Sequence, residues 1–141
     1  MLNLINNLER KDITKMLLGY KFALEEMNTK ISILFEEYRV VHEYNPIEHV
    51  STRIKSPKSI MRKIEHKGLA WSIHEIENNI RDIAGVRIVC SFEEDIYRVA
   101  KMLCNQNDIT VVEVKNYIKK PKENGYRSLH LIVKVPIFLT D

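Results

Sequence analysis

The sequence contains few of the residues that mark secreted or membrane proteins. It has two cysteines, Cys90 and Cys104, and both lie in apolar stretches, so neither a disulfide framework nor a zinc site is expected. No run approaches the roughly 18 apolar residues that cross a membrane. The N-terminus lacks a basic region followed by an apolar block, so no signal peptide is expected. These absences predict a cytoplasmic protein with free thiols and no membrane partner.

The excess of one charge sign over the other is also small. The 22 Lys and Arg exceed the 19 Asp and Glu by a net charge of +3, which does not mark a nucleic-acid-binding protein, and RNA is not an expected partner. The distribution is more informative, because cations are concentrated between Arg53 and Lys67, where Glu65 is the single acid. Like charges this close repel each other unless an anion binds among them. This segment is therefore a candidate anion site.

Apolar residues recur every three or four positions from Ile13 to Val41, which predicts a long helix over about residues 12–44. Asn45-Pro46 ends the helix, because the residue before a proline disfavours helical angles. The apolar stripe either packs on the rest of the domain or contacts another subunit. We favour packing within the domain, since one stripe serves one partner at a time.

The remaining residues, about 47–141, alternate short helices and strands. Capping residues predict helices that begin after Ser56, Ser72 and Ser91, and Gly68 ends the first of them. Strand patterns cover residues 50–55, 86–91, 110–118 and 128–135. This order predicts a single α/β (α+β) domain over residues 1–141, with a mixed β-sheet flanked by helices.

The first candidate site lies in the basic segment. Arg53 and Lys55 alternate along a predicted strand and share one of its faces. Ser59 and Lys63 lie one turn apart on the helix that follows. Strand cations that lead into a helix N-terminus form a cradle for polyphosphate, since the free amides there also favour anions. A solvated basic surface is the simpler interpretation, and spacing alone does not exclude it.

The second candidate site is Asp82, just before an apolar strand that Arg87 interrupts. An Asp at a strand edge can hold Mg²⁺, which needs few protein carboxylates because phosphate oxygens supply other ligands. An Arg nearby can neutralise a phosphoryl group in transfer. An ion pair of Asp82 with Arg81 or Arg87 is the simpler alternative. No second Asp stands two residues away, so the common two-carboxylate nucleotidyltransferase signature is absent.

The third candidate site follows a turn. Asn124-Gly125 predicts a tight turn with positive φ, and Tyr126 comes directly after it, where a ring can stack on a purine. Ser128 and His130 share a strand face behind this turn. Three cations surround it: Lys120, Lys122 and Arg127. A hairpin with a core tyrosine and a hydrogen-bonded histidine is the alternative.

Taken together, these segments resemble a known family. Asp82–Arg87 and Asn124–His130 match, nearly letter for letter, two motifs of the RelA/SpoT-like (p)ppGpp synthetase domain. The basic segment resembles a third motif of that domain, and the three occur in the family's order. The likeness covers about residues 44–136 and is greatest to the small alarmone synthetases, which also begin with a long helix. It implies a nucleotidyltransferase-like fold and a GTP pyrophosphokinase of the stringent response, which transfers the β,γ-pyrophosphate of ATP to the 3′-OH of GDP or GTP.

The resemblance also implies roles for individual residues. Asp82 would hold Mg²⁺ and act in catalysis together with Arg87. Tyr126 would stack on the guanine of GDP or GTP. The remaining ATP-binding residues would be Arg53, Lys55, Ser59 and Lys63, assisted by Arg87, and the remaining acceptor-binding residues Lys122, Asn124 and His130. The full-length protein is expected to be a homo-oligomer.

The sequence departs from the family pattern in two places. The family has a basic residue near position 66, where this chain has His66, and we expect Arg62 or Lys67 to substitute for it. The family continues after the last strand with a Glu-x-Gln-Ile-Arg strand, whose Glu is the second acidic group of the site. The sequence ends at Asp141 before that strand, so we expect these residues alone to be a nearly inactive synthetase. The family's hydrolase motif, a His-Asp pair with metal-ligand spacing, is also absent.

Two alternatives stay open, one within the same class of enzymes and one from a different class. A relative that modifies adenosine nucleotides or the 3′ end of tRNA would share the fold, although Asn124 and Tyr126 match the guanosine-using members. A catalytically impaired module that only binds nucleotides or RNA is the second alternative, and the absence of the second acidic residue keeps it open.

Overall fold

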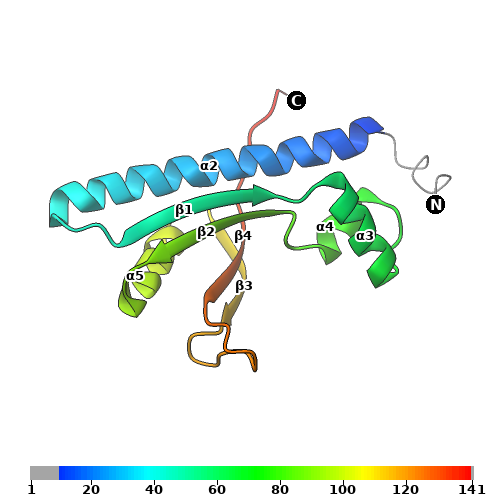
Figure 1. Ribbon diagram of the computed structural model, residues 1–141. Coiled ribbons are helices and arrows are strands. Elements are labelled where there is room, and N and C mark those ends of the chain that lie inside the picture. Colours follow the sequence, from blue (N-terminus) through cyan, green and yellow to red (C-terminus); the bar gives the residue numbers. More distant parts are fainter. Residues whose placement is uncertain (1–9, 141) are drawn as a thin grey trace. The chain divides into compact units, whose positions relative to one another are not determined.

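The structure is a computed structural model that describes residues 10–140 (Figure 1). Its elements follow the order helix, strand, helix, helix, strand, helix, strand, strand, as the sequence predicts. They are α2 (Arg10–His42), β1 (Ile47–Ile54), α3 (Pro57–Lys67), α4 (Ile73–Asn79), β2 (Ala84–Cys90), α5 (Glu93–Cys104), β3 (Thr110–Asn116) and β4 (Leu129–Lys134). The α+β class with a long N-terminal helix is confirmed.

The strands pair two by two. Within residues 10–140, β1 pairs with β2 and β3 pairs with β4, which gives two two-stranded sheets where the sequence suggested one mixed sheet. β3 and β4 are antiparallel, with Thr110 opposite Lys134 and Asn116 opposite Leu129. A register shift between Val111 and Glu113 makes a bulge, which bends the hairpin locally.

The apolar stripe of α2 is largely covered. Met16, Ile31 and Phe35 are buried, and the predicted stripe from Ile13 to Tyr38 is at least half-buried. This supports packing within the chain. Val41, the last residue of the predicted stripe, is 66% exposed.

Both predicted ends of α3 are confirmed. The Ser56 hydroxyl oxygen accepts a hydrogen bond from the Ser59 amide at 3.2 Å, and Pro57 occupies the first turn. Gly68 has φ 66°, and its amide donates to the carbonyls of Glu65 and Ile64. A serine cap and a left-handed glycine therefore define this helix from short-range chemistry alone.

The predicted cap at Ser91 is wrong. α5 begins at Glu93, and Phe92 takes the capping position without a side-chain hydrogen bond. The Ser91 hydroxyl instead donates to the Glu48 carboxylate at 2.6 Å, a charge-assisted bond that turns the side chain toward β1. The predicted cap at Ser72 is confirmed, since its oxygen accepts from the Glu75 amide at 3.2 Å.

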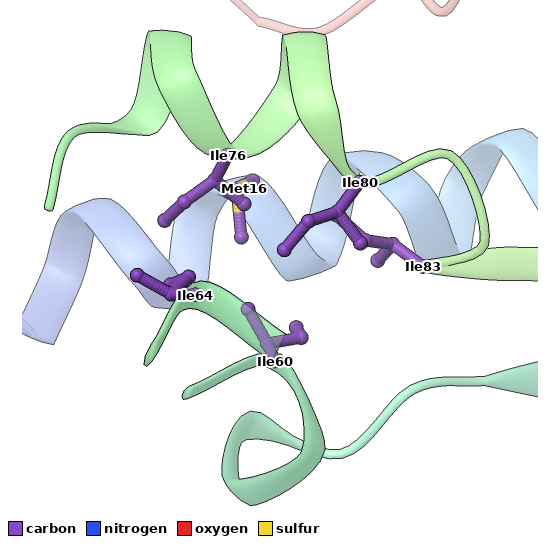
Figure 2. Packing of buried hydrophobic residues seen from close by; sticks show 6 residues of the cluster. All are labelled: Met16, Ile60, Ile64, Ile76, Ile80 and Ile83. Atoms are coloured by element: carbon purple, nitrogen blue, oxygen red, sulfur yellow. The ribbon is translucent and has the colours of Figure 1, made fainter. Parts of the chain in front are cut away.

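The described chain forms two compact units, which comprise residues 10–25 with 51–87 and residues 26–50 with 88–140. The core of the first unit brings together side chains from α2, α3, α4 and the segment that leads into β2 (Figure 2). Its buried members are Met16, Ile60, Ile64, Ile76, Ile80 and Ile83. Ile83 is fully buried and directly follows the candidate residue Asp82.

The second unit buries one charged group among its apolar side chains. Asp95 of α5 is 2% exposed, and its carboxylate accepts hydrogen bonds from the Tyr44 hydroxyl and from Arg98 Nη1 at 2.9 Å. The bond to Asp95, ahead of burial, raises the pKa of Tyr44 to about 12. The buried apolar residues of this unit are Ile31, Phe35, Val99, Leu103, Ile109 and Ile118.

Two further expectations concern cysteines and the membrane. Cys90 and Cys104 are free thiols, and burial raises the pKa of each. In the described part of the chain, α2 is the longest helix, and neither it nor any other helix there is apolar over a membrane-spanning length.

Candidate functional site

Two lysines hold the carboxylate of Asp82 in the first unit. Lys63 Nζ lies 2.7 Å from Oδ1, and Lys55 Nζ lies 3.1 Å from Oδ2. Each carboxylate oxygen therefore faces its own ammonium group. The alternative, in which Asp82 pairs with Arg81 or Arg87, is not what the structure shows. We call Lys55, Lys63 and Asp82 the lysine–aspartate cluster.

Local backbone structure positions these three side chains. The Lys55 amide donates to the Ile83 carbonyl at 2.6 Å, which joins the end of β1 to the residue after Asp82. Lys63 lies on α3, whose start is fixed by the Ser56 cap and whose rotation is fixed by the buried side chains of Ile60 and Ile64. The cluster is therefore held by one backbone bond and one buried helix face.

The electrostatics of the cluster favour a charged carboxylate. Burial acts to raise the pKa of Asp82, but the hydrogen bonds and charges of Lys63 and Lys55 outweigh it, and the pKa lies below its usual value. The Asp82 side chain stays 45% exposed, against 14% for Lys55 and 32% for Lys63. Asp82 is thus ionised at neutral pH and accessible to a ligand.

The other predicted donor-site residues lie outside this cluster. Arg53 on β1 and Arg87 on β2 are exposed, and neither side chain makes a hydrogen bond or ion pair to another residue within 10–140. Ser59 accepts a hydrogen bond from the Ser56 hydroxyl at 3.0 Å. The structure therefore brings together Lys55, Lys63 and Asp82 but leaves the two guanidinium groups directed to solvent.

One contact distinguishes Lys67 from Arg62, the two cations expected to replace the basic residue that is missing at position 66. Lys67 Nζ donates to the Asn79 carbonyl at 3.2 Å, which engages it at the end of α4. Arg62 is exposed on α3. Of the two, Arg62 is the cation that remains available for a ligand.

The donor set limits how a metal could be held. No group of three or more His, Cys, Asp or Glu in residues 10–140 is arranged to hold an ion. Asp82 alone offers carboxylate oxygens beside two cations. This fits Mg²⁺ that takes its other ligands from phosphate oxygens and water, and it does not fit an ion bound by protein groups alone.

The second unit carries a group of rings at the β3–β4 hairpin. The ring centroids of Tyr117, Tyr126 and His130 lie 6.2 Å (Tyr117–Tyr126), 5.3 Å (Tyr117–His130) and 5.8 Å (Tyr126–His130) apart, all edge to face. Lys122 Nζ lies 4.8 Å from the Tyr117 centroid and 5.3 Å from that of Tyr126. Such distances allow cation–π attraction. We call these four residues the aromatic cluster.

The turn before Tyr126 is fixed by hydrogen bonds. Asn124 Oδ1 accepts from the Tyr126 amide at 3.0 Å, and the Gly125 amide donates to the Lys122 carbonyl at 2.8 Å. Gly125 has φ 86°, as the Asn-Gly pair predicts. The Lys122 amide donates to the Tyr126 carbonyl at 3.0 Å, which closes the loop. Asn124 therefore shapes the turn as well as standing beside Tyr126.

Tyr126 and His130 are joined through their polar atoms. The Tyr126 oxygen lies 2.9 Å from His130 Nε2. Burial, then the charges of Lys122 and Lys115, lowers the pKa of His130, which favours a neutral imidazole, and the tautomer of that ring decides which of the two atoms donates. The Tyr126 residue stays 43% exposed, which leaves part of the ring accessible.

Tyr117 is the member of this cluster to which the sequence assigned no role. Its amide donates to the Ser128 carbonyl at 2.8 Å, which extends the hairpin beyond the last strand pair. Tyr117 lies near His130 because the two predicted strands pair in this register. Tyr117 could therefore have been identified from the sequence only if the register were known. Lys122, Asn124, Tyr126 and His130 come together as predicted.

Comparison with known proteins agrees with these clusters. The family described as "Region found in RelA / SpoT proteins" matches residues 52–139, a segment that contains both clusters. GTP pyrophosphokinase YwaC of Bacillus subtilis (strain 168) is 50% identical over 131 residues, which cover 93% of this chain and 62% of that protein. GTP pyrophosphokinase YjbM of the same organism is 39% identical over 130 residues, which cover 92% and 60%.

A solved structure shows the same fold. The small alarmone synthetase 1 from Bacillus subtilis, bound to its product pppGpp, superposes with a TM-score of 0.82 at 39% identity, over 92% of this chain and 66% of that chain. The present chain thus spans less than two thirds of the length of these relatives. Because the family region covers more than half of the chain and includes every candidate residue, the chain belongs to the family defined by the region found in RelA / SpoT proteins.

Proposed function

We propose that the protein is a GTP pyrophosphokinase, a (p)ppGpp synthetase that uses ATP as donor and GDP or GTP as acceptor. The observation that carries this proposal is the presence of two clusters of the kinds that the reaction needs. One combines cations with a carboxylate for a metal-bound polyphosphate, and the other combines an accessible ring with a lysine for a base. The names of the two Bacillus relatives support the same activity.

The donor side uses the lysine–aspartate cluster. Lys55 and Lys63 bind ATP phosphates by charge-assisted hydrogen bonds, and the exposed guanidinium groups of Arg53 and Arg87 add charge from β1 and β2. Ser59 contributes its hydroxyl at the start of α3, where the helix dipole favours anions. Asp82 holds Mg²⁺ that arrives with ATP, and the ion, when bound, supplies shielding of phosphate charge.

The acceptor side uses the aromatic cluster. The exposed part of Tyr126 stacks on the guanine of GDP or GTP, while His130 holds its hydroxyl and fixes the ring. Lys122 and Asn124 place the base and the ribose. The small alarmone synthetase 1 structure contains pppGpp, which is consistent with a guanosine nucleotide here.

The reaction needs positioning more than covalent catalysis. The acceptor 3′ oxygen attacks the β-phosphorus of ATP, the bond from that phosphorus to the α,β-bridging oxygen breaks, and AMP leaves while the 3′-OH proton is released. Arg87 neutralises charge on the group in transfer. No enzyme nucleophile is required, because holding the reactants in line supplies most of the acceleration.

Product analysis separates this proposal from its alternatives. The purified full-length protein is incubated with ATP and Mg²⁺ and, in parallel, with GDP, GTP, AMP or deacylated tRNA. We expect a 3′-pyrophosphorylated product from GDP or GTP together with an equal amount of AMP. A product from AMP or tRNA alone would favour the adenosine- or tRNA-modifying alternative. Binding of ATP and GDP without any product would favour a non-catalytic module.

The setting of the activity is also a proposal. We place the protein in the cytoplasm, where ATP and GTP are available and where Cys90 and Cys104 stay reduced. A homo-oligomer of the full-length protein remains a prediction, which sedimentation of that protein tests.

A further inference from the structure

The carboxylate proposed to bind Mg²⁺ is already paired with two cations. Its Oδ1 bonds to Lys63 at 2.7 Å, and its Oδ2 pairs with Lys55 at 3.1 Å. Both lone-pair-bearing oxygens therefore have a cation in contact. The Asp82 side chain is 45% exposed and each oxygen keeps a further lone pair, but a divalent ion bound there would lie beside two positive charges, whose repulsion opposes it until at least one ammonium group moves away.

The same two lysines are the cations proposed to bind the donor phosphates. Both lysines are paired with Asp82, so Asp82 and a phosphate group compete for the same two ammonium groups. Binding of the metal and binding of phosphate are therefore both favoured by opening the same ion pairs. Lys63 has a long flexible stem and 32% exposure, so its ammonium can turn toward a ligand, while the Lys55 backbone stays anchored to Ile83.

We propose that Lys55 and Lys63 lock Asp82 and that a polyphosphate opens the lock, so that Mg²⁺ reaches the protein only with or after the polyphosphate. This inference rests on the donor-site assignment in the proposed function. When phosphate oxygens draw the two ammonium groups away, the Asp82 oxygens are released toward the ion that the phosphates carry. The lock prevents the chain from holding free Mg²⁺ without a nucleotide.

The lock has a consequence of unusual sign. Asp82 competes with phosphate for the lysines and repels it as a like charge, so its removal strengthens binding of a metal-free polyphosphate. Asp82→Asn is expected to bind inorganic triphosphate in EDTA about ten-fold more tightly than the wild-type protein. The same variant loses the additional affinity that Mg²⁺ gives. A carboxylate that made no contact with the lysines would affect metal-free binding only through its charge, as Glu65 does.

The first experiment measures triphosphate affinity by calorimetry, with EDTA and then with Mg²⁺. Wild type, Asp82→Asn and Glu65→Gln are compared. Glu65 lies exposed on α3, and its neutralisation changes the net charge equally without contact to Lys55 or Lys63. The lock predicts tighter metal-free binding for Asp82→Asn alone. Equal tightening in Glu65→Gln, or none in Asp82→Asn, overturns it.

The second experiment uses Mn²⁺ as a paramagnetic substitute for Mg²⁺ and measures its binding to the nucleotide-free protein by electron paramagnetic resonance. Lys63→Gln frees one Asp82 oxygen and is expected to bind Mn²⁺ about ten-fold more tightly than wild type. Lys58→Gln, on the same helix but outside the cluster, is the control. Equal Mn²⁺ affinity in wild type and Lys63→Gln overturns the lock. If circular dichroism shows that Lys63→Gln is unfolded, Lys55→Gln takes its place in the comparison.

The outcomes distinguish this inference from the proposed function. Inorganic triphosphate and Mn²⁺ report on the lock without any synthesis of (p)ppGpp. If the affinities change as expected but no product forms, the lock stands and the proposed activity fails. If product forms while the affinities do not change, the activity stands and the lock is wrong.

Discussion

Tyr126 combines a ring that is partly exposed with a hydroxyl held by His130, so the two parts of the side chain can be tested separately. Tyr126→Ala is expected to weaken GDP binding by about 1–3 kcal/mol, because the stacking surface is lost. Tyr126→Phe keeps the ring, loses only the bond to His130 and is expected to bind GDP nearly as wild type. Calorimetry with GDP and ATP measures both. Unchanged GDP affinity in folded Tyr126→Ala removes this ring from the acceptor site.

Arg53 is an exposed cation at the start of the donor segment. If it contacts a phosphate, Arg53→Ala is expected to weaken ATP binding by about 1.5–3 kcal/mol, which corresponds to roughly ten-fold or more. Arg39→Ala removes the same charge from an exposed position on α2 and is expected to leave ATP affinity unchanged. Calorimetric titration with ATP and GDP distinguishes the cases. An equal loss for both nucleotides would indicate a general charge or folding effect.

His130 provides a pH-dependent test of the aromatic cluster. Burial first, then Lys122 and Lys115, lowers the pKa of His130, so nuclear magnetic resonance titration should place it below about 6.5. Lys122→Gln is expected to move this pKa part of the way back up, because the burial contribution remains. The unfolded chain takes up the proton first as pH falls. The stability that His130 contributes is therefore present above about pH 6.5 and is lost below it.

At the residue scale the sequence identified the side chains better than their contacts. Lys55, Lys63 and Asp82 were all predicted as site residues, but the ion-pair partners considered for Asp82, as the simpler alternative to a metal, were its chain neighbours Arg81 and Arg87. The observed partners are 19 and 27 positions away, counted from Lys63 and Lys55. The Lys55–Ile83 backbone bond brings them together, and no local pattern announces a bond of that range.

At the scale of elements, α3 shows how much a helix depends on its ends. Gly68 has φ 66°, and an added Cβ would meet nothing within 4 Å. The cost of Gly68→Ala is therefore conformational and is expected to be about 1–2 kcal/mol of unfolding free energy. Gly68→Asn should cost less, since Asn tolerates left-handed angles.

Gly85→Ala is the matched control for this prediction. Gly85 lies in β2 without positive φ and also has open space around an added Cβ. Its replacement should leave stability unchanged or raise it slightly. Urea unfolding of the three variants measures the differences. A similar loss at both glycines would mean that space, and not φ, limits position 68.

The predictability of elements follows the range of the interactions that set their ends. α3 was correct at both ends because Ser56, Pro57 and Gly68 act within one turn. The predicted start of α5 was wrong: the Ser91 hydroxyl bonds to Glu48 of β1, and Phe92 occupies the capping position. The hairpin strands were predicted to within two residues, while the bulge between Val111 and Glu113 has no glycine to announce it.

At the scale of the whole chain, the class and order of elements were predictable because each depends on local periodicity. The division into two compact units was not, since α2, β1 and β2 contribute residues to both. A continuous helix carries no signal in its sequence for where one set of contacts gives way to another. Burial of the α2 stripe followed its periodicity up to Tyr38, but the exposure of Val41 depends on what the helix end meets.

The core of the first unit supports the lysine–aspartate cluster, and Ile83 connects the two. Its side chain is fully buried in the core, and its carbonyl accepts the Lys55 amide. Ile83→Ala is expected to lower the free energy of unfolding by about 2–5 kcal/mol, because it removes buried methyl groups and leaves a cavity. Ile83→Val should cost about 0.5–1.5 kcal/mol. Urea unfolding followed by circular dichroism measures both.

Ile33→Ala is the control that makes this prediction specific to burial. Ile33 is 60% exposed on α2, so the same deletion there is expected to change stability by less than about 0.5 kcal/mol. A loss at Ile33 equal to that at Ile83 would contradict the burial pattern of the isolated chain. If that loss grew with protein concentration, a second copy would be covering this face of α2, because only association makes stability depend on concentration. The comparison therefore tests the core of one chain and the predicted homo-oligomer in a single series.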